Sequence, residues 1–258
     1  IDHKKIIKNI TKKTKAILVV YQMGHAADMD KILKIAKKYN LKVIEDNAES
    51  IGASYKGRLL GTIGDISTYS FFGNKIITTG EGGALLTNNE NIAIKCRELR
   101  DHGMNIHKKY HHTDLGYNYR MTNMQAAIGL AQIERLDEIL SIRENQMKYY
   151  YNKLYDISGI QLREYSDWCN PVHWMMTLTL DKKYNRQNFI NFMKNSGIEC
   201  RQMINPVHKA DHFVNHFSDE YDNANKISEQ SVHLPSGTGL IQKDIDYISD
   251  VIVKYVSS

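Results

Sequence analysis

The chain has 258 residues, 42% of them hydrophobic and 24% charged, which is typical of a globular protein with one large domain or two modest ones. Its net charge of +5 comes from lysines scattered among acids rather than from a basic stripe, so we expect no nucleic-acid partner. No apolar run approaches the roughly 20 residues that span a bilayer, and the three cysteines are far apart, so we expect a cytoplasmic protein with reduced thiols and no membrane partner.

The first predicted unit is a strand, a helix and a second strand. Residues 16–21 read as a continuous apolar strand. Apolar residues then recur at helical spacing and predict a helix with one buried face, formed by Met29, Ile32, Leu33, Ala36 and Tyr39. Val43 and Ile44 return as a strand that ends at Glu45 and Asp46. This order predicts two parallel strands joined by a right-handed crossover.

A loop rich in glycines and hydroxyl groups follows the alternating strand over residues 66–72. Lys75 lies in this loop among Ser70, Gly73, Thr78, Thr79, Gly80, Gly82 and Gly83. In open α/β sheets, ligands bind outside the carboxyl ends of strands, which is also where Asp46 is expected. A lysine that forms a Schiff base and an aspartate that keeps a pyridine nitrogen protonated are the two groups that pyridoxal phosphate requires.

Two other interpretations of this loop compete with a cofactor site. A lysine in a glycine loop is most often a solvated surface residue. The glycines favour a binding loop instead, because they allow positive φ and a close approach of the backbone to a ligand. A Walker-type phosphate loop does not fit, because Lys75 precedes most of the glycines.

The alternation of strands and helices continues after the loop. Residues 83–87 are predicted to form a short strand, and Asn88 or Asn89 to cap a helix that ends at Asp101. A capping box over residues 122–125 then opens a long helix. Its expected buried side consists of Ala127, Ile128, Ala131 and Leu136.

The long helix leads into a second predicted domain. There we expect a strand over residues 174–180, a helix over 188–196 and a terminal helix over 243–255. We therefore predict a large domain over residues 1–155 and a small one over 156–258.

Several segments, in one order, resemble those of the DegT/DnrJ/EryC1/StrS sugar aminotransferases, which are fold type I pyridoxal phosphate enzymes. The matching segments are residues 24–30, 43–50, 64–67, 70–83 and 116–121, with looser matches at 205–208 and 234–237. The resemblance implies an α/β fold like that of aspartate aminotransferase. Such a fold has a mostly parallel sheet with helices on both faces, plus a smaller C-terminal α+β domain.

The resemblance also implies a role for individual residues. Lys75 would carry the cofactor and then move a proton between cofactor and sugar, and Asp46 would pair with the pyridinium nitrogen. Glu49 stands where many members have Gln, and would lie near the ring hydroxyl, as in the perosamine-type subgroup that this chain resembles most. Ser70 would donate to the cofactor phosphate, and Asn118 would reach the phosphate in the neighbouring subunit.

The reaction implied by the resemblance is a transamination. The enzyme would move an amino group from glutamate to C4 of a nucleotide-linked 4-keto-6-deoxysugar, in a homodimer with shared active sites. Related dehydratases have a histidine in place of the lysine, so Lys75 favours transamination over dehydration.

The resemblance further places a histidine-rich segment near the substrate sugar. The candidate substrate contacts are His102, Tyr110, His111, Arg201 and His208. His107 and His111 stand four apart, as two metal ligands on a helix would. Gly103 and the charged residues between the histidines favour a loop, so we expect no metal.

The largest departure from the family pattern is at the beginning of the chain. Members usually carry a further stretch before the strand over 16–21, including a Gly-Thr turn that binds the cofactor phosphate and an aromatic residue that stacks on its ring. We therefore expect an N-terminally incomplete form. The alternative is a catalytically silent or truncated member with a structural or interaction role. A Rossmann-type enzyme is disfavoured because no G-x-G-x-x-G follows a strand.

Overall fold

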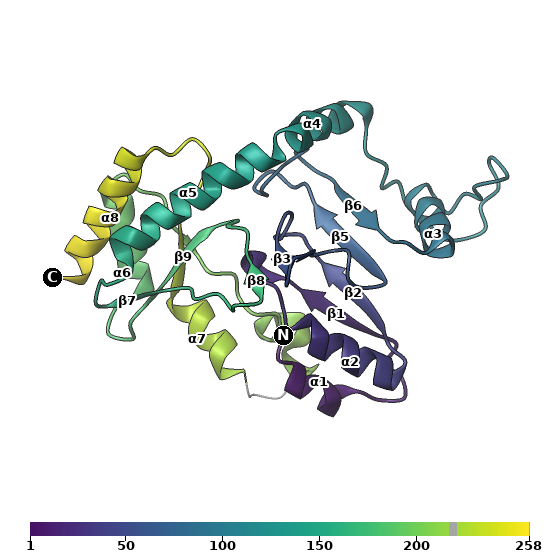
Figure 1. Cartoon of the computed structure of the whole chain (residues 1–258), viewed down its shortest axis with the longest axis horizontal. Coiled ribbons are helices and arrows are strands. Elements are labelled where there is room, and N and C mark those ends of the chain that lie inside the picture. Colours follow the sequence, from purple (N-terminus) through teal and green to yellow (C-terminus); the bar gives the residue numbers. More distant parts are fainter. Residues whose placement is uncertain (217–220, 258) are drawn as a thin grey trace. The chain divides into compact units, whose positions relative to one another are not determined.

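The computed structural model describes residues 1–216 and 221–257 (Figure 1). They form two compact units: residues 1–140 with 165–174, and residues 141–164 with 175–258. The predicted domain boundary at residue 155 stays a prediction. Among the described residues, no helix is both long and apolar enough to cross a membrane.

The first unit is built on a mixed sheet with the strand order β1-β2-β5-β6. Its strands are β1 (Ala16–Val20), β2 (Lys42–Asp46), β5 (Ile66–Ser70) and β6 (Gly83–Leu86). The first three strands are parallel and β6 is antiparallel to β5. This mostly parallel sheet confirms the predicted fold class.

The helix α2 (Met29–Tyr39) connects β1 to β2 and confirms the predicted crossover. Asp28 caps its N-terminus through a side-chain hydrogen bond, and Asn40 ends it in the left-handed conformation at φ 51°. The helix α1 (His3–Asn9), which was not predicted, packs beside α2. A single 3-10 turn (Gln22–Gly24) follows β1.

A fully buried carboxylate organises the carboxyl end of β2. Glu45 accepts hydrogen bonds from the Tyr21 hydroxyl at 2.7 Å and from the backbone of Gly61, Ile63 and Gly64 at 2.8, 2.7 and 2.5 Å. Four donors thus satisfy the charge of the carboxylate. The three backbone donors also attach the loop over residues 61–64 to the end of β2. Because side chains alternate along a strand, the next residue, Asp46, belongs to the opposite face of the sheet.

A smaller sheet in the first unit draws on a distant part of the sequence. Its order is β4-β3-β8, from β4 (Arg58–Leu59), β3 (Ser54–Tyr55) and β8 (Cys169–Asn170). The pairing of β8 with β3 holds residues 165–174 in this unit.

Three helices follow the lysine loop: α3 (Glu90–Arg100), α4 (Asn123–Glu134) and α5 (Leu136–Leu154). Asn89 caps α3, and Thr122 forms the predicted capping box with Gln125 at the start of α4. The long surface loop between α3 and α4 extends away from the sheet in Figure 1.

The predicted buried side of the long helix is wrong. Ala127, Ile128 and Ala131 are exposed and Leu136 is only half-buried, whereas Gly129 is the buried residue of α4. The helix also breaks at Arg135, which has φ −106° and ψ 11°. Apolar spacing identifies the apolar face of a helix, but not whether the same chain covers that face.

The second unit contains an antiparallel sheet with the order β10-β11-β9-β7. Its strands are β7 (Ile160–Leu162), β9 (Met176–Leu180), β10 (Arg201–Gln202) and β11 (Ser231–Leu234). Its helices are the larger part of α5, from Ser141 onward, with α6 (Arg186–Asn195), α7 (Asp222–Gln230) and α8 (Gln242–Val256). Two 3-10 turns lie at Val207–Lys209 and Asp211–His216.

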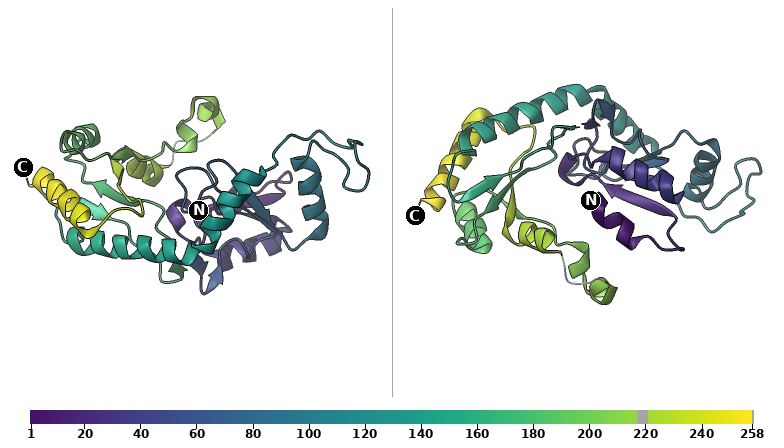
Figure 2. Two further views of the ribbon diagram at one scale, coloured as in Figure 1. Left: turned by 90° about the horizontal axis from the view of Figure 1, so that it is seen from above. Right: turned by 60° about the horizontal axis from the view of Figure 1, so that its bottom comes forward.

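The core of the second unit follows the alternation of β9. Met176, Leu178 and Leu180 are buried in one cluster with Phe189 of α6 and Ile252 of α8. The intervening Thr177 and Thr179 face the other side of the sheet and are half-buried. Figure 2 shows α5 and α8 running side by side, where Asp246 joins Tyr149 and Lys153 of α5. This arrangement matches the predicted α+β character of the C-terminal part.

Candidate active site

The lysine loop is a tight excursion between β5 and β6. At its base, the Phe71 backbone N–H donates to Gly82 O at 2.9 Å, and Thr79 N–H donates to Phe71 O at 2.9 Å. Lys75 N–H donates to Phe72 O at 3.0 Å. Gly82 has φ 139°, and a Cβ atom there would lie 2.8 Å from the Thr79 hydroxyl. The glycine is therefore needed for the closure of the loop.

Inside this loop the Lys75 ammonium forms an ion pair with Glu49. Its Nζ lies 3.6 Å from Glu49 Oε1, and the two side chains are only 14% and 12% exposed. The other carboxylate oxygen, Oε2, accepts a hydrogen bond from the Met23 backbone at 2.7 Å. Burial raises the pKa of Glu49, and the Met23 hydrogen bond and the charge of Lys75 oppose this shift without offsetting it.

Trp174 forms the other wall around the lysine. Lys75 Nζ lies 4.0 Å from the centre of the indole ring, and the indole Nε1–H donates to Asn74 O at 2.7 Å. Trp174 is 4% exposed. From the sequence alone, Trp174 is expected only at the start of a strand, because no local pattern connects it with a loop 100 positions away.

The two strand-end residues lie at the same edge of the sheet. Asp46 is the last residue of β2 and pairs in register with Thr68 of β5, two positions before Ser70 at the end of that strand. Asp46 Oδ1 accepts from Ala48 N–H at 3.0 Å, and Ser70 Oγ accepts from Phe72 N–H at 3.3 Å. The charge of Asp46 contributes to the raised pKa of Glu49. Asp46, Glu49, Ser70 and Lys75 therefore all lie near the carboxyl ends of β2 and β5.

Asn118 and three candidate substrate contacts lie in the surface loop between α3 and α4. An isolated bridge joins Asn118 to Asp101 at the base of this loop, and Asn118 Oδ1 accepts from Arg120 N–H at 3.4 Å. His102 and Tyr110 have φ of 61° and 60°, and Tyr110 is 77% exposed. The neighbouring His111 is exposed as well.

The Asp101 carboxylate holds the start of this loop. His102 Nδ1 lies 3.0 Å from Asp101 Oδ1, and Arg120 Nη1 lies 3.6 Å from Oδ2. These two contacts lower the pKa of Asp101. No three of the described histidine, cysteine, aspartate and glutamate side chains gather as a metal site would require.

The remaining two candidates, Arg201 and His208, belong to the second unit. Arg201 is exposed on β10, and its Nε donates to Glu199 at 3.2 Å. His208 Nε2 lies 2.8 Å from Asn225 Oδ1, and its ring stacks on Tyr221 at 4.5 Å. Both side chains thus have partners within their own unit.

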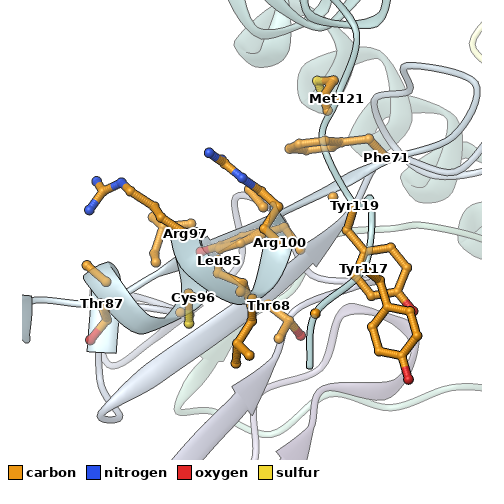
Figure 3. A pocket seen from close by; sticks show the side chains of 18 of the residues that line it. Thr68, Phe71, Leu85, Thr87, Cys96, Arg97, Arg100, Tyr117, Tyr119 and Met121 are labelled. Atoms are coloured by element: carbon orange, nitrogen blue, oxygen red, sulfur yellow. The ribbon is translucent and has the colours of Figure 1, made fainter. Parts of the chain in front are cut away.

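A cavity of about 1160 Å³ lies along β6 (Figure 3). Its walls come from β5, β6, α3 and the loop before α4, and include Leu85, Cys96, Arg100, Tyr117 and Tyr119. It contains none of the four candidate residues at the carboxyl edge of the sheet. Phe71 and Gly83, at the two ends of the lysine loop, do belong to its lining.

Comparison with known proteins relates this arrangement to one family. The chain matches the DegT/DnrJ/EryC1/StrS aminotransferase family over residues 1–253. It is 41% identical to GDP-perosamine synthase from Caulobacter vibrioides, over 96% of this chain and 68% of that protein. It is 39% identical to GDP-perosamine synthase from Escherichia coli O157:H7, over 98% of this chain and 68% of that protein.

Similarity extends to a named cofactor enzyme and to solved structures. The putative pyridoxal phosphate-dependent aminotransferase EpsN from Bacillus subtilis is 33% identical, over 93% of this chain and 63% of that protein. The crystal structure of S. venezuelae DesV is 28% identical, with a TM-score of 0.92 over 100% of this chain and 69% of that chain. The chain is therefore a member of the DegT/DnrJ/EryC1/StrS aminotransferase family.

Proposed function

We propose that this protein is a pyridoxal phosphate-dependent aminotransferase that transfers an amino group from glutamate to C4 of a nucleotide-linked 4-keto-6-deoxysugar. The observation that carries the proposal is the buried pair of Lys75 and Glu49 beside Asp46 at the carboxyl edge of the sheet. The likeness to two GDP-perosamine synthases supports the sugar class.

The residues at this edge fit the cofactor. Pyridoxal phosphate needs an amine for its aldehyde, a carboxylate for its ring nitrogen and donors for its phosphate. Lys75 provides a mostly buried amine, Asp46 a carboxylate on the neighbouring strand end, and Ser70 a half-buried hydroxyl. When bound, the cofactor supplies an aldehyde carbon and an electron-withdrawing ring.

Each of these residues has a separate task in the proposal. Lys75 would hold the cofactor through Nζ, and the same amine would serve as the base that moves a proton at C4 of the sugar. Asp46 keeps the proton on the ring nitrogen. Glu49 orients the lysine amine, since its own position is fixed by the Met23 backbone. Ser70 binds the phosphate. In the net reaction, glutamate becomes 2-oxoglutarate while the sugar ketone becomes an amine.

We also propose a homodimer in which Asn118 reaches the cofactor phosphate of the partner subunit. Asn118 lies in the loop that leads directly into α4. Exposed apolar residues of α4 support a protein partner on this helix: Met124, Ile128, Leu130 and Ile133. A two-fold interface uses the same surface on both subunits, so each subunit would complete the other's site.

A catalytically silent family member is not favoured. Such a protein would have no need to keep a buried lysine and glutamate together, because burying charged groups opposes folding unless they are paired.

Sugar nucleotides and glutamate are the proposed substrates, and the cytoplasm is the proposed location.

The proposal is tested by supplying the purified protein with pyridoxal phosphate, glutamate and a panel of 4-keto-6-deoxysugar nucleotides. We expect 2-oxoglutarate and an aminated sugar, detected by mass spectrometry, in equal amounts. Lys75→Ala should abolish both turnover and borohydride-trapped cofactor on the protein. Lys56→Ala, which removes an exposed lysine of the same unit, should change neither. Turnover by Lys75→Ala at the normal rate would refute the assignment.

A further inference from the structure

We infer that Trp174 is a positioning residue that holds Lys75 ready for the cofactor. The inference rests on the proposed function, in which Lys75 carries pyridoxal phosphate. Nothing in the reaction itself requires a tryptophan, and Trp174 lies outside all the sequence segments that resemble the family. It is the contacts within the first unit that bring the indole ring to the lysine.

The first contact fixes the backbone just before the lysine. The indole Nε1–H donates to Asn74 O at 2.7 Å, which is a short and therefore well-formed hydrogen bond. On the other side of the same peptide, Lys75 N–H donates to Phe72 O at 3.0 Å. The Asn74–Lys75 peptide is thus held at both its carbonyl and its amide, so the direction in which the lysine side chain leaves the loop is set.

The second contact fixes the end of the side chain. Lys75 Nζ lies 4.0 Å from the centre of the Trp174 ring and 3.6 Å from Glu49 Oε1. An ammonium group over an indole face is attracted by the ring's negative surface, and the attraction is stronger in a site shielded from water. Trp174 and Glu49 are both mostly buried, so the amine is confined between a ring and a carboxylate.

The chain contains a matched control on the same segment. Its second tryptophan, Trp168, is half-buried and donates to Ala26 O at 3.4 Å, with no ring contact to a lysine among the described cation–ring pairs. Both residues belong to the stretch 165–174, which pairs with β3 through β8. Replacing Trp168 therefore tests the segment without touching the lysine.

The first experiment needs no cofactor. Because the chain has two tryptophans, Trp168→Phe leaves Trp174 as the single indole emitter. In this background, Lys75→Met removes the ammonium group at nearly constant volume, and Lys56→Met is its control. An adjacent ammonium quenches indole emission by proton transfer to the ring. We expect the emission of Trp174 to rise in Lys75→Met and to stay unchanged in Lys56→Met. Equal emission from both would overturn the contact.

The second experiment measures attachment of pyridoxal phosphate to Lys75, by stopped-flow absorbance and by borohydride trapping with peptide mass spectrometry. Trp168→Phe should match the wild type. Trp174→Leu, which removes both contacts, should attach the cofactor roughly tenfold more slowly. Trp174→Phe keeps a ring but no N–H donor and should fall between. It also carries the test if the Leu variant does not fold.

The two experiments separate the inference from the proposed function. If Trp168→Phe attaches the cofactor to Lys75 and Trp174→Phe and Trp174→Leu do so equally fast, the positioning role is refuted while the proposed function stands. If even Trp168→Phe and the wild type attach no cofactor at Lys75, the proposed function fails. The fluorescence result then decides alone whether Trp174 positions the lysine amine.

Discussion

The Nζ atom of Lys75 lies 3.6 Å from Oε1 of Glu49, and neither side chain is more than 14% exposed. An ion pair in such a position is desolvated, and for Glu49 the attraction to Lys75 offsets only part of the cost of burying the charge. Burial disfavours the ionised form of the carboxylate and so raises the pKa of Glu49. The carboxylate that we propose to orient the lysine amine therefore lowers the stability of the folded protein when it is ionised.

Replacing Glu49 by Gln should make the protein more stable and less active. The folded protein binds more protons at Glu49 than the unfolded chain from about the ordinary pKa of 4.5 up to the raised pKa. Stability therefore falls as the pH rises through this window, and the ionised carboxylate lowers stability at neutral pH. We expect Glu49→Gln to have a higher Tm than the wild type at pH 7, with the difference shrinking as the pH falls toward 4.5.

The same variant should attach cofactor to Lys75 more slowly, because an amide orients the ammonium less strongly than a carboxylate does. Glu90→Gln, at the exposed start of α3, is the control and should gain no stability. A lower Tm for Glu49→Gln at pH 7 would contradict the predicted penalty.

Asp46→Asn should lower kcat without preventing cofactor binding. The amide cannot keep the ring nitrogen protonated, and the loss of such a charge pair corresponds to roughly 3–5 kcal/mol, or two to almost four orders of magnitude in rate. The measurement is kcat at saturating cofactor. Asp30→Asn, which breaks an exposed ion pair with Lys56, should keep normal kcat. An Asp46→Asn variant within tenfold of the wild type would exclude the role.

Inactive variants should complement each other if the sites are shared between subunits. Lys75→Ala and Asn118→Ala each damage one part of the proposed site. After subunit exchange, a mixed dimer contains one site with both residues intact, so we expect activity to return. Light scattering and differently tagged chains confirm the exchange. Proven exchange without recovered activity would show that Asn118 serves only its own loop, where its Oδ1 accepts from Arg120 N–H.

His233 should make the second unit sensitive to acid. This side chain is 6% exposed on β11, where Nδ1 lies 2.9 Å from Thr177 Oγ1. Burial lowers the pKa of His233 from 6.5 to about 4. The unfolded chain therefore binds more protons than the folded protein between these values, and stability falls as the pH falls from 6.5 to 4, by about 3 kcal/mol in total.

Denaturant unfolding at several pH values checks this prediction. His233→Gln keeps a polar side chain that cannot become charged, so its stability should change less between pH 6.5 and 4 than that of the wild type. His107→Gln removes an exposed histidine and should follow the wild type. Parallel pH curves for His233→Gln and the wild type would contradict the assignment.

Local signals in the sequence predicted local structure well. The crossover through α2 and the capping box of Thr122 and Gln125 rest on patterns a few residues long, and both are confirmed. The direction of β6 was not predicted, because a short strand has no sequence signal that distinguishes parallel from antiparallel pairing. The prediction that the apolar side of α4 is buried is wrong, because Ile128 on that side is 51% exposed.

The candidate site shows the same division. Lys75 and Asp46 could be proposed from the sequence because a glycine loop and a strand end indicate where ligands bind. Their roles stay predictions. The resemblance placed Glu49 and Lys75 at the same cofactor, but it did not predict the ion pair between them. The contact of Trp174 was not predicted either, because it depends on pairing between β3 and β8.

The route of the chain limits how this enzyme could be divided or recombined. The backbone passes between the two units three times, at residues 140/141, 164/165 and 174/175. A chain cut after residue 140 would retain Lys75 but lose β8 and the indole ring beside the lysine. If the segments after residue 140 were exchanged between relatives, Trp174 would be replaced by the other relative's residue, while Lys75 would stay. Residues 165–174 should therefore be kept together with residues 1–140 when relatives are recombined, although residues 141–164 separate them in the sequence.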